Sequence, residues 1–248
     1  MSSSTDYLLA IEDLTVSFDG FKAVDGLNLY VDKDELRVII GPNGAGKTTV
    51  LDMICGKTKP TSGSIKFRNR ELVGMSEHKI VHSGVGRKFQ TPSIYENLTV
   101  FENLEVSFPK GRSVLGCIGF RRTADVVMRI QEVAREIGLV EELDKEGGLL
   151  SHGQKQWLEI GMLLMQEPEL IMLDEPVAGM SPAEREQTAK LIKRISKGRS
   201  IIIIEHDMEF VSSIADKVTV LHLGKLLAEG TMSEIKTNPK VVEVYLGH

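Results

Sequence analysis

Residues 41–48, with the sequence GPNGAGKT, form the segment with the clearest chemistry, because they match the pattern G-x-x-x-x-G-K-[ST] completely. A mostly apolar segment, residues 36–40, precedes them, and a predicted helix from Thr48 to about Cys55 follows. Glycines let backbone N–H groups surround a phosphate, and the positive end of the following helix adds to the same site. Lys47 would hold the β- and γ-phosphates and the Thr48 hydroxyl would ligate Mg²⁺. A plain glycine-rich turn with a surface lysine is disfavoured, because the motif is complete and has a strand and a helix on its two sides.

Two carboxylates follow a second apolar segment, residues 170–173. Open α/β sheets bind their ligands at the carboxyl ends of strands, where Asp174 and Glu175 are expected. Asp174 is suited to hold Mg²⁺ through water, and Glu175 to orient or deprotonate an attacking water. Two acids after a strand are usually a solvated loop, but the phosphate-binding motif in the same chain favours the catalytic interpretation.

The elements that must position these residues follow from hydrophobic periodicity. Residues 9–11, 14–18 and 27–31 alternate apolar and polar positions and predict antiparallel strands, with a turn at Asp19-Gly20. Residues 123–137 show helical spacing, and strands alternate with helices from residue 170 to residue 214. The sequence therefore predicts an α/β fold: a mostly parallel core sheet, an N-terminal antiparallel β part and an inserted helical block.

Composition narrows the class of protein. The 248 residues are 42% hydrophobic and 26% charged, typical of a globular chain. The net charge of −5 argues against nucleic-acid binding. Two cysteines are too few for a disulfide framework and favour a reducing compartment. No apolar run reaches the ~20 residues of a membrane span, and no secretory signal is visible. We therefore expect a cytoplasmic chain.

Further motifs then show a family resemblance. Residues 150–154, LSHGQ, are similar to the LSGGQ signature of ABC (ATP-binding cassette) transporters, Gln90 resembles the Q-loop glutamine, and His206 the switch histidine. With the two segments above, five motifs in family order cover essentially the whole chain, which resembles an ABC transporter's nucleotide-binding subunit. The resemblance implies the P-loop NTPase fold and one nucleotide-binding domain, 1–248. Within it, 1–90 and 166–248 would form the RecA-like core with the antiparallel β subdomain, and 91–165 the α-helical signature subdomain.

The resemblance also implies a site for ATP and Mg²⁺. The residues expected to take part in catalysis are Glu175, His206 and Gln90, and those expected to ligate Mg²⁺ are Thr48, Gln90 and Asp174. The residues expected to contact ATP are Phe18, Gly41, Pro42, Asn43, Gly44, Ala45, Gly46, Lys47, Thr48, Thr49, Ser151, Gly153 and Gln154.

Two of these residues have a competing interpretation. Phe18 would stack on adenine, with core packing as the alternative and Phe21 as the other candidate for stacking. Ser151 would cap its helix, and in the family this helix end faces the γ-phosphate of ATP bound to a second subunit.

The sequence departs from the family's pattern at two places. His152 stands where the family prefers glycine, and we expect its side chain to be exposed. Residues 178–181, AGMS, lack the usual D-loop aspartate, which puts a D-loop role for Ser181 in doubt. The irregular segment 107–121 is assigned no element.

Partners and cargo rest on the resemblance alone. It implies a head-to-tail dimer with a second ABC ATPase subunit, either a copy of this chain or a paralogue. It also implies two transmembrane permease subunits and, indirectly, a periplasmic or extracellular solute-binding protein. It implies no nucleic acid, and a place on the inner face of the cell membrane. The runs 86–90, 149–160 and 176–180 resemble the ATPases of urea (amide) importers, with branched-chain amino acid importers as the alternative. A soluble ABC-type ATPase acting on nucleic acid or ribosomes is a remote alternative. It is disfavoured because the chain has neither a long coiled coil nor a second cassette.

Overall fold

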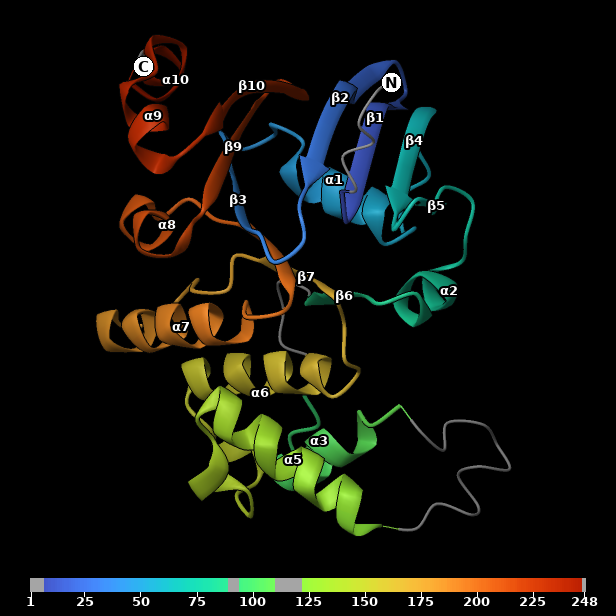
Figure 1. Ribbon diagram of the computed structural model, residues 1–248. Coiled ribbons are helices and arrows are strands. Elements are labelled where there is room, and N and C mark those ends of the chain that lie inside the picture. The colour runs from blue at the N-terminus through green and yellow to red at the C-terminus, as the bar shows by residue number, and fades with distance from the viewer. Residues whose placement is uncertain (1–6, 89–93, 110–121, 247–248) are drawn as a thin grey trace. The chain divides into compact units, whose positions relative to one another are not determined.

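The computed structural model describes residues 7–88, 94–109 and 122–246 (Figure 1). Their contacts group the chain into two compact units. The first unit is Met1–Arg87, Glu169–Glu175 and Ser196–His248, and the second unit is Lys88–Pro168 and Pro176–Ile195. The second unit contains the segment 91–165, expected to form the helical subdomain, together with Pro176–Ile195.

An antiparallel sheet opens the first unit. Its strands are β1 (Leu9–Phe18), β2 (Phe21–Val31), β4 (Ser62–Phe67) and β5 (Arg70–Glu71), in the order β2-β1-β4-β5. The predicted turn between β1 and β2 is confirmed, with positive φ angles of 49° at Asp19 and 89° at Gly20. Such angles match the twist of a hairpin with a two-residue loop.

The core sheet is mostly parallel. Its strands are β3 (Leu36–Ile40), β6 (Val85–Lys88), β7 (Leu170–Asp174), β8 (Ser200–Ile204), β9 (Lys217–His222) and β10 (Lys225–Gly230), in the order β10-β9-β3-β8-β7-β6. β3 pairs in parallel with β8 and β9, and β7 with β8, while β9 and β10 form an antiparallel hairpin. Every residue of β3, β7 and β8 is buried, as expected for strands covered on both faces. The carboxyl ends of β3, β7 and β8 therefore meet at one edge of this sheet.

Five helices complete the described part of the first unit: α1 (Lys47–Ile54), α2 (Glu77–His82), α8 (Met208–Ile214), α9 (Met232–Thr237) and α10 (Pro239–Leu246). The buried face of α1 (Val50, Leu51, Met53 and Ile54) belongs to a hydrophobic cluster that includes side chains of both sheets. Helix α1 lies beside the antiparallel sheet in Figure 1. This shared core holds the start of α1 in place at the end of β3.

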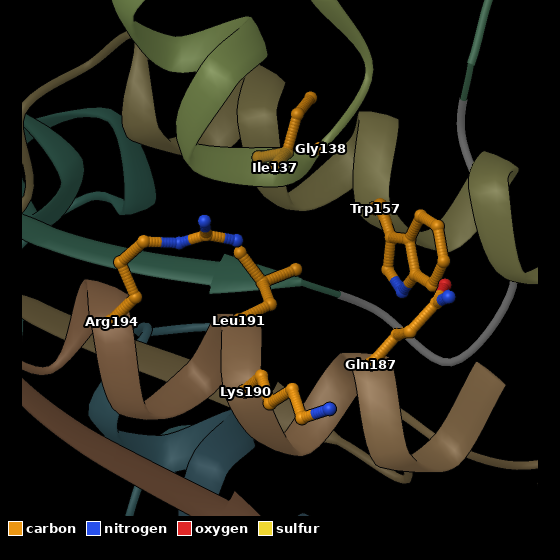
Figure 2. Close-up of a pocket in the computed structure, with 7 residues that line it drawn as sticks. All are labelled: Ile137, Gly138, Trp157, Gln187, Lys190, Leu191 and Arg194. Carbon is orange, nitrogen blue, oxygen red and sulfur yellow. The ribbon is translucent and has the colours of Figure 1, made fainter. Parts of the chain in front are cut away.

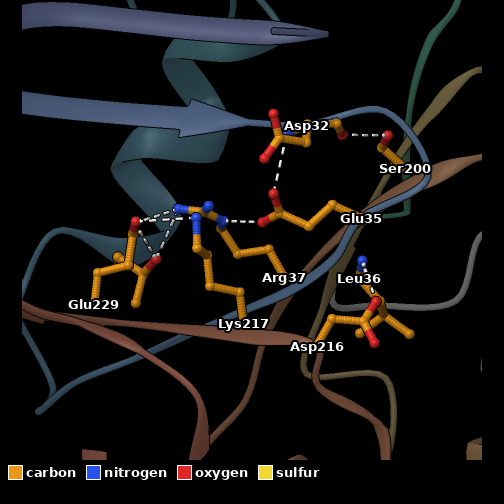
Figure 3. A network of polar contacts seen from close by, with 9 residues as sticks. Asp32, Glu35, Leu36, Arg37, Ser200, Asp216, Lys217 and Glu229 are labelled. Atoms are coloured by element: carbon orange, nitrogen blue, oxygen red, sulfur yellow. Dashed lines mark hydrogen bonds and ion pairs between the residues drawn. The ribbon is translucent and has the colours of Figure 1, made fainter. Parts of the chain in front are cut away.

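A buried polar network ties the amino-terminal end of β3 to its neighbours (Figure 3). The Arg37 side chain is fully buried; its Nε donates to Glu35 Oε1 at 2.5 Å and its Nη1 to Thr219 Oγ1 at 3.1 Å. The same guanidinium forms an ion pair with Glu229 of β10. A buried charge needs such partners. The network therefore fixes β10 and β9 against the amino-terminal end of β3, while the phosphate-binding loop follows the carboxyl end of the same strand.

The second unit is helical. It contains α3 (Val100–Val106), α5 (Ala124–Ile137), α6 (His152–Leu164), α7 (Pro182–Ile195) and two 3-10 turns, η1 (Val140–Glu142) and η2 (Gly147–Leu149). Helix α3 begins with a capping box of Thr99 and Glu102 and ends at Val106, just before the irregular segment 107–121. Residues 110–121 lie outside the described residues.

Helix α7 groups with the second unit because it packs on α5 and α6. Trp157 Nε1 of α6 donates to Thr188 Oγ1 of α7 at 2.8 Å, and both side chains are buried. The three helices surround a pocket of about 330 Å³ (Figure 2), lined by Ile137, Gly138, Trp157, Gln187, Lys190, Leu191 and Arg194. This packing depends on residues 31 positions apart in the chain, which local periodicity does not reveal.

Candidate nucleotide-binding and hydrolysis site

The loop between β3 and α1 has a backbone that only glycine fits at two positions. Gly41 has a φ of 154°, and a Cβ there would lie 2.2 Å from the Leu221 carbonyl oxygen. Gly46 has a φ of 96° and precedes α1, and a Cβ there would lie 2.5 Å from the Ala23 carbonyl oxygen. The glycines of the motif therefore allow the loop to turn tightly between β2, β9 and α1, which leaves its N–H groups at the helix start.

A second tight turn supports this loop. Gly224, between β9 and β10, donates its N–H to the Ala45 carbonyl at 3.2 Å and accepts from the Asp25 N–H at 2.9 Å. The phosphate-binding loop is thus joined to the antiparallel sheet through a residue of the C-terminal hairpin.

Lys47 folds back over the loop. Its Nζ donates to the carbonyl oxygens of Gly41, at 2.7 Å, and Pro42, at 3.0 Å. Burial lowers the pKa of this ammonium, and the nearby charges of Glu175 and Asp174 oppose that shift. A half-buried ammonium beside a glycine-rich loop at a helix start is suited to bind phosphate oxygens.

Asp174 ends β7 and is 4% exposed. Burial raises the pKa of its carboxyl, the charge of Arg87 and a hydrogen bond with the Thr48 side chain oppose the rise, and the charge of Glu175 adds to it. A carboxylate and a hydroxyl in contact beside a phosphate-binding loop are hard oxygen donors that fit Mg²⁺. No group of three or more His, Cys, Asp and Glu residues able to hold a metal occurs in 7–88, 94–109 and 122–246.

Glu175 and His206 come together at the carboxyl ends of β7 and β8. Glu175 has a positive φ of 47° and donates its N–H to the Ile204 carbonyl at 3.0 Å. Its Oε1 lies 3.7 Å from Nδ1 of His206, whose ring is exposed. The buried Glu205 carboxylate accepts the His206 N–H at 3.0 Å and so holds the backbone beside the ring. A strained acid next to a histidine at a strand end is an arrangement that catalytic sites use.

The aromatic candidates lie at the tip of the β1–β2 hairpin. Phe18 is 49% exposed and Phe21 is 66% exposed, and the two residues pair across the turn. The core-packing alternative for Phe18 is therefore wrong. Either exposed ring offers a flat apolar face to a base.

The start of α6, in the second unit, donates hydrogen bonds to a carboxylate of the same chain. Ser151 caps the helix, with its Oγ accepting from the Gln154 N–H and the Gln154 side chain accepting the Ser151 N–H. Glu184 Oε1 also accepts from Ser151 Oγ at 3.0 Å and from the Gly153 N–H at 3.2 Å. The N-terminal donors of this helix thus serve a carboxylate of α7.

The two departures from the family pattern also meet here. The exposed side chain expected for His152 is confirmed, and its Nε2 lies 3.1 Å from the Ala178 carbonyl oxygen. Ser181 donates its N–H and its hydroxyl to Glu184 Oε2, at 3.0 and 2.8 Å.

Sequence reasoning missed two residues of the site. Arg87 is buried and places Nη1 at 2.6 Å from Asp52 Oδ1 and Nη2 at 3.5 Å from Asp174 Oδ2. Glu184 is the second. The only local signal was the position of Arg87 three residues before Gln90, and nothing in the sequence near Glu184 predicts its partners. Gln90 lies outside the described residues.

A phosphate-binding loop on a mostly parallel sheet, with a helical unit and an LSHGQ segment capping one of its helices, defines an ATP-binding cassette. The sequence family described as "ABC transporter" matches residues 24–178, and the family described as "Branched-chain amino acid ATP-binding cassette transporter" matches residues 225–248.

Individual relatives agree with the family match. The chain is 37% identical to the high-affinity branched-chain amino acid transport ATP-binding protein BraF of Pseudomonas aeruginosa, over 97% of this chain and 98% of that one. It is 36% identical to LivG of Escherichia coli K12, with the same coverage. A solved ABC transporter cassette in its ADP conformation superposes with a TM-score of 0.86 and 33% identity, over 98% of this chain and 100% of that one.

The chain therefore belongs to the ATP-binding proteins of ABC transporters, whose members hydrolyse ATP to power transport. BraF and LivG are named for branched-chain amino acid transport, the cargo that the sequence offered as the alternative. The comparisons do not show the expected urea specificity. In the described part of the chain, no helix is long and apolar enough to cross a membrane.

Proposed function

We propose that this chain binds Mg²⁺-ATP in the first unit and hydrolyses it to drive an importer. One observation carries the proposal: Lys47, Thr48, Asp174, Glu175 and His206 meet at one edge of the core sheet although they span 160 residues of sequence. The packing of the hydrophobic core does not require Asp174, Glu175 and His206 at this edge. Phosphoryl transfer, in contrast, uses such groups to hold a metal, position a water and contact phosphate.

The residues have distinct parts in the reaction. The loop N–H groups and Lys47 hold the β- and γ-phosphates, and Thr48, Asp174 and Gln90 would hold Mg²⁺. The metal would neutralise charge on the transferred phosphoryl group. Glu175 orients a water and accepts its proton as the water oxygen bonds to the γ-phosphorus and the bond to the bridging oxygen of ADP breaks. His206, 3.7 Å from Glu175, is placed to contact the γ-phosphate.

A second subunit completes the site. The N-terminus of α6, with Ser151, Gly153 and Gln154, would contact the γ-phosphate of ATP bound to a partner in a head-to-tail dimer. Its partner would be a copy of this chain or a paralogue. Two membrane permeases and a solute-binding protein would complete the importer, and this chain would then lie on the inner face of the cell membrane.

The relatives' names favour branched-chain amino acids as the cargo class. Urea or a short amide is a second candidate, supported by the runs 86–90, 149–160 and 176–180, which resemble the ATPases of urea importers. Cargo is selected by other subunits, so its test lies outside this chain. The ATPase, reconstituted with its permeases and solute-binding protein, should be stimulated by leucine in the first case and by urea in the second.

Trapping the dimer tests the proposed cycle. Glu175→Gln keeps the shape of the side chain and removes the base, so Mg²⁺-ATP should convert this variant from monomer to dimer in light scattering. The variant should lose at least about a hundredfold in turnover, the lower range for general-base catalysis. Adding Lys47→Ala should abolish the dimer. A Glu175→Gln protein that stays monomeric at saturating Mg²⁺-ATP would overturn the two-subunit site.

A further inference from the structure

The Glu184 carboxylate has four hydrogen-bond donors, all from the starts of α6 and α7 in the second unit. Its Oε1 accepts from Ser151 Oγ at 3.0 Å and from the Gly153 N–H at 3.2 Å. Its Oε2 accepts from the Ser181 N–H at 3.0 Å and from Ser181 Oγ at 2.8 Å. These bonds lower the pKa of Glu184 to about 2, those from Ser181 contributing most. The carboxylate is therefore ionised, and it joins the start of α6 to the start of α7.

Two of these four donors are the ones that a γ-phosphate would need. A serine hydroxyl has a single proton, and that of Ser151 is donated to Glu184 while its oxygen accepts the Gln154 N–H at 3.2 Å. The Gly153 N–H is likewise directed at Glu184. A phosphate oxygen and the carboxylate are both anions and cannot accept the same two protons.

We propose that Glu184 is an internal competitor for the γ-phosphate, which holds the Ser151 and Gly153 donors until ATP on a second subunit displaces it. The inference rests on the proposed two-subunit site. Glu184 thereby sets the ATP concentration at which two subunits close. It also takes back the same donors when phosphate departs, which favours reopening.

Ser181 makes the displacement reversible. It stands where the family's D-loop has aspartate, and its N–H and hydroxyl hold Oε2 of Glu184. When Oε1 gives up the donors of α6, these two bonds keep the carboxylate anchored at the start of α7. A neutral hydroxyl at position 181 can donate to Glu184, whereas an aspartate carboxylate there would repel it.

The experiment measures the ATP concentration for half-maximal dimerisation in a Glu175→Gln background. Adding Glu184→Gln removes the charge and keeps the size of the side chain. The half-maximal concentration should fall by about tenfold, because the phosphate no longer displaces a charged acceptor. ATP binding to the monomer should not change, because Glu184 belongs to the second unit and the phosphate-binding loop to the first.

Glu186→Gln is the matched control. Glu186 lies on the same helix, and its carboxylate bonds Lys190 at 2.7 Å. This variant should leave the half-maximal concentration unchanged. A threshold that is unchanged or higher in Glu184→Gln, with the helical content retained in circular dichroism, would overturn the competition and assign Glu184 to helix capping alone. If Glu175→Gln itself never dimerises, the two-subunit site fails instead, so the two failures are distinguishable.

Discussion

Nη2 of Arg87 lies 3.5 Å from Oδ2 of Asp174, and both side chains are buried. The second terminal nitrogen of the guanidinium, Nη1, donates to Oδ1 of Asp52 in α1 at 2.6 Å. Arg87 therefore connects the helix that follows the phosphate-binding loop to the carboxylate expected at Mg²⁺. It is the last residue of the first unit before the chain enters the second.

Replacing Arg87 with methionine should weaken the Mg²⁺-dependent part of nucleotide binding. The Asp174 carboxylate then loses the charge that holds it in place, and its pKa rises further from burial. Fluorescent ATP should bind equally to both proteins in EDTA, while the gain in affinity on adding Mg²⁺ should fall by about tenfold in the variant.

Two further variants test whether Arg87 positions the Asp174 carboxylate or only supports the fold. Arg87→Lys should recover part of the Mg²⁺ effect, because it keeps the charge. Arg68→Met removes an exposed ion pair with Glu169 in the same unit and should have no effect. An equal loss of affinity with and without Mg²⁺ in Arg87→Met would show that Arg87 only supports the fold.

Thr188→Val should destabilise the second unit by about 1–3 kcal/mol, because the buried Trp157 N–H loses its acceptor. Trp157 is the single tryptophan of the chain, so the urea dependence of its fluorescence reports on this unit. Gln187→Ala, at the exposed neighbouring position, should change the free energy of unfolding by less than about 0.5 kcal/mol. Equal stabilities of the two variants would contradict the role given to the Trp157–Thr188 bond.

Arg37→Met should destabilise the first unit by about 3–5 kcal/mol, since it leaves the Glu35 and Glu229 carboxylates without their buried partner (Figure 3). Lys217→Met removes only a partly exposed cation, 3.3 Å from Glu229, and should cost less than about 1 kcal/mol. Chemical denaturation followed by circular dichroism measures both. If ATP affinity falls while stability does not, the network has been misassigned.

The contribution of Glu184 to stability should depend on pH. Its folded-state pKa of about 2 lies below the ordinary 4.5, so the ionised form stabilises the fold. That contribution is fully present above pH 4.5 and is lost as the pH falls from 4.5 toward about 2. The free energy of unfolding of the unchanged protein minus that of Glu184→Gln should shrink over this range. A difference that is constant with pH would mean that Glu184 is not held as a carboxylate.

Much of the fold followed from local patterns of sequence. The strands 36–40, 170–174 and 200–204 are buried on both faces, and the mostly apolar character of 36–40 predicted this for the first of them. The phosphate-binding loop and Asp174-Glu175 follow such strands directly, so parallel pairing alone brings them to one edge. Alternation alone would place Phe18 in the core, which was the alternative to base stacking, yet its side chain is half exposed at a hairpin tip.

The sequence by itself determined the phosphate-binding chemistry, because the groups needed for it are consecutive in the chain and their backbone is set by glycines and by the helix that follows. Only the tertiary structure decided that α7 joins the helical unit, that Arg87 faces Asp174, and that Glu184 holds the donors of Ser151. Each of these contacts joins residues at least 30 positions apart. They depend on which helix faces pack together, and periodicity identifies a buried face without identifying the surface that covers it.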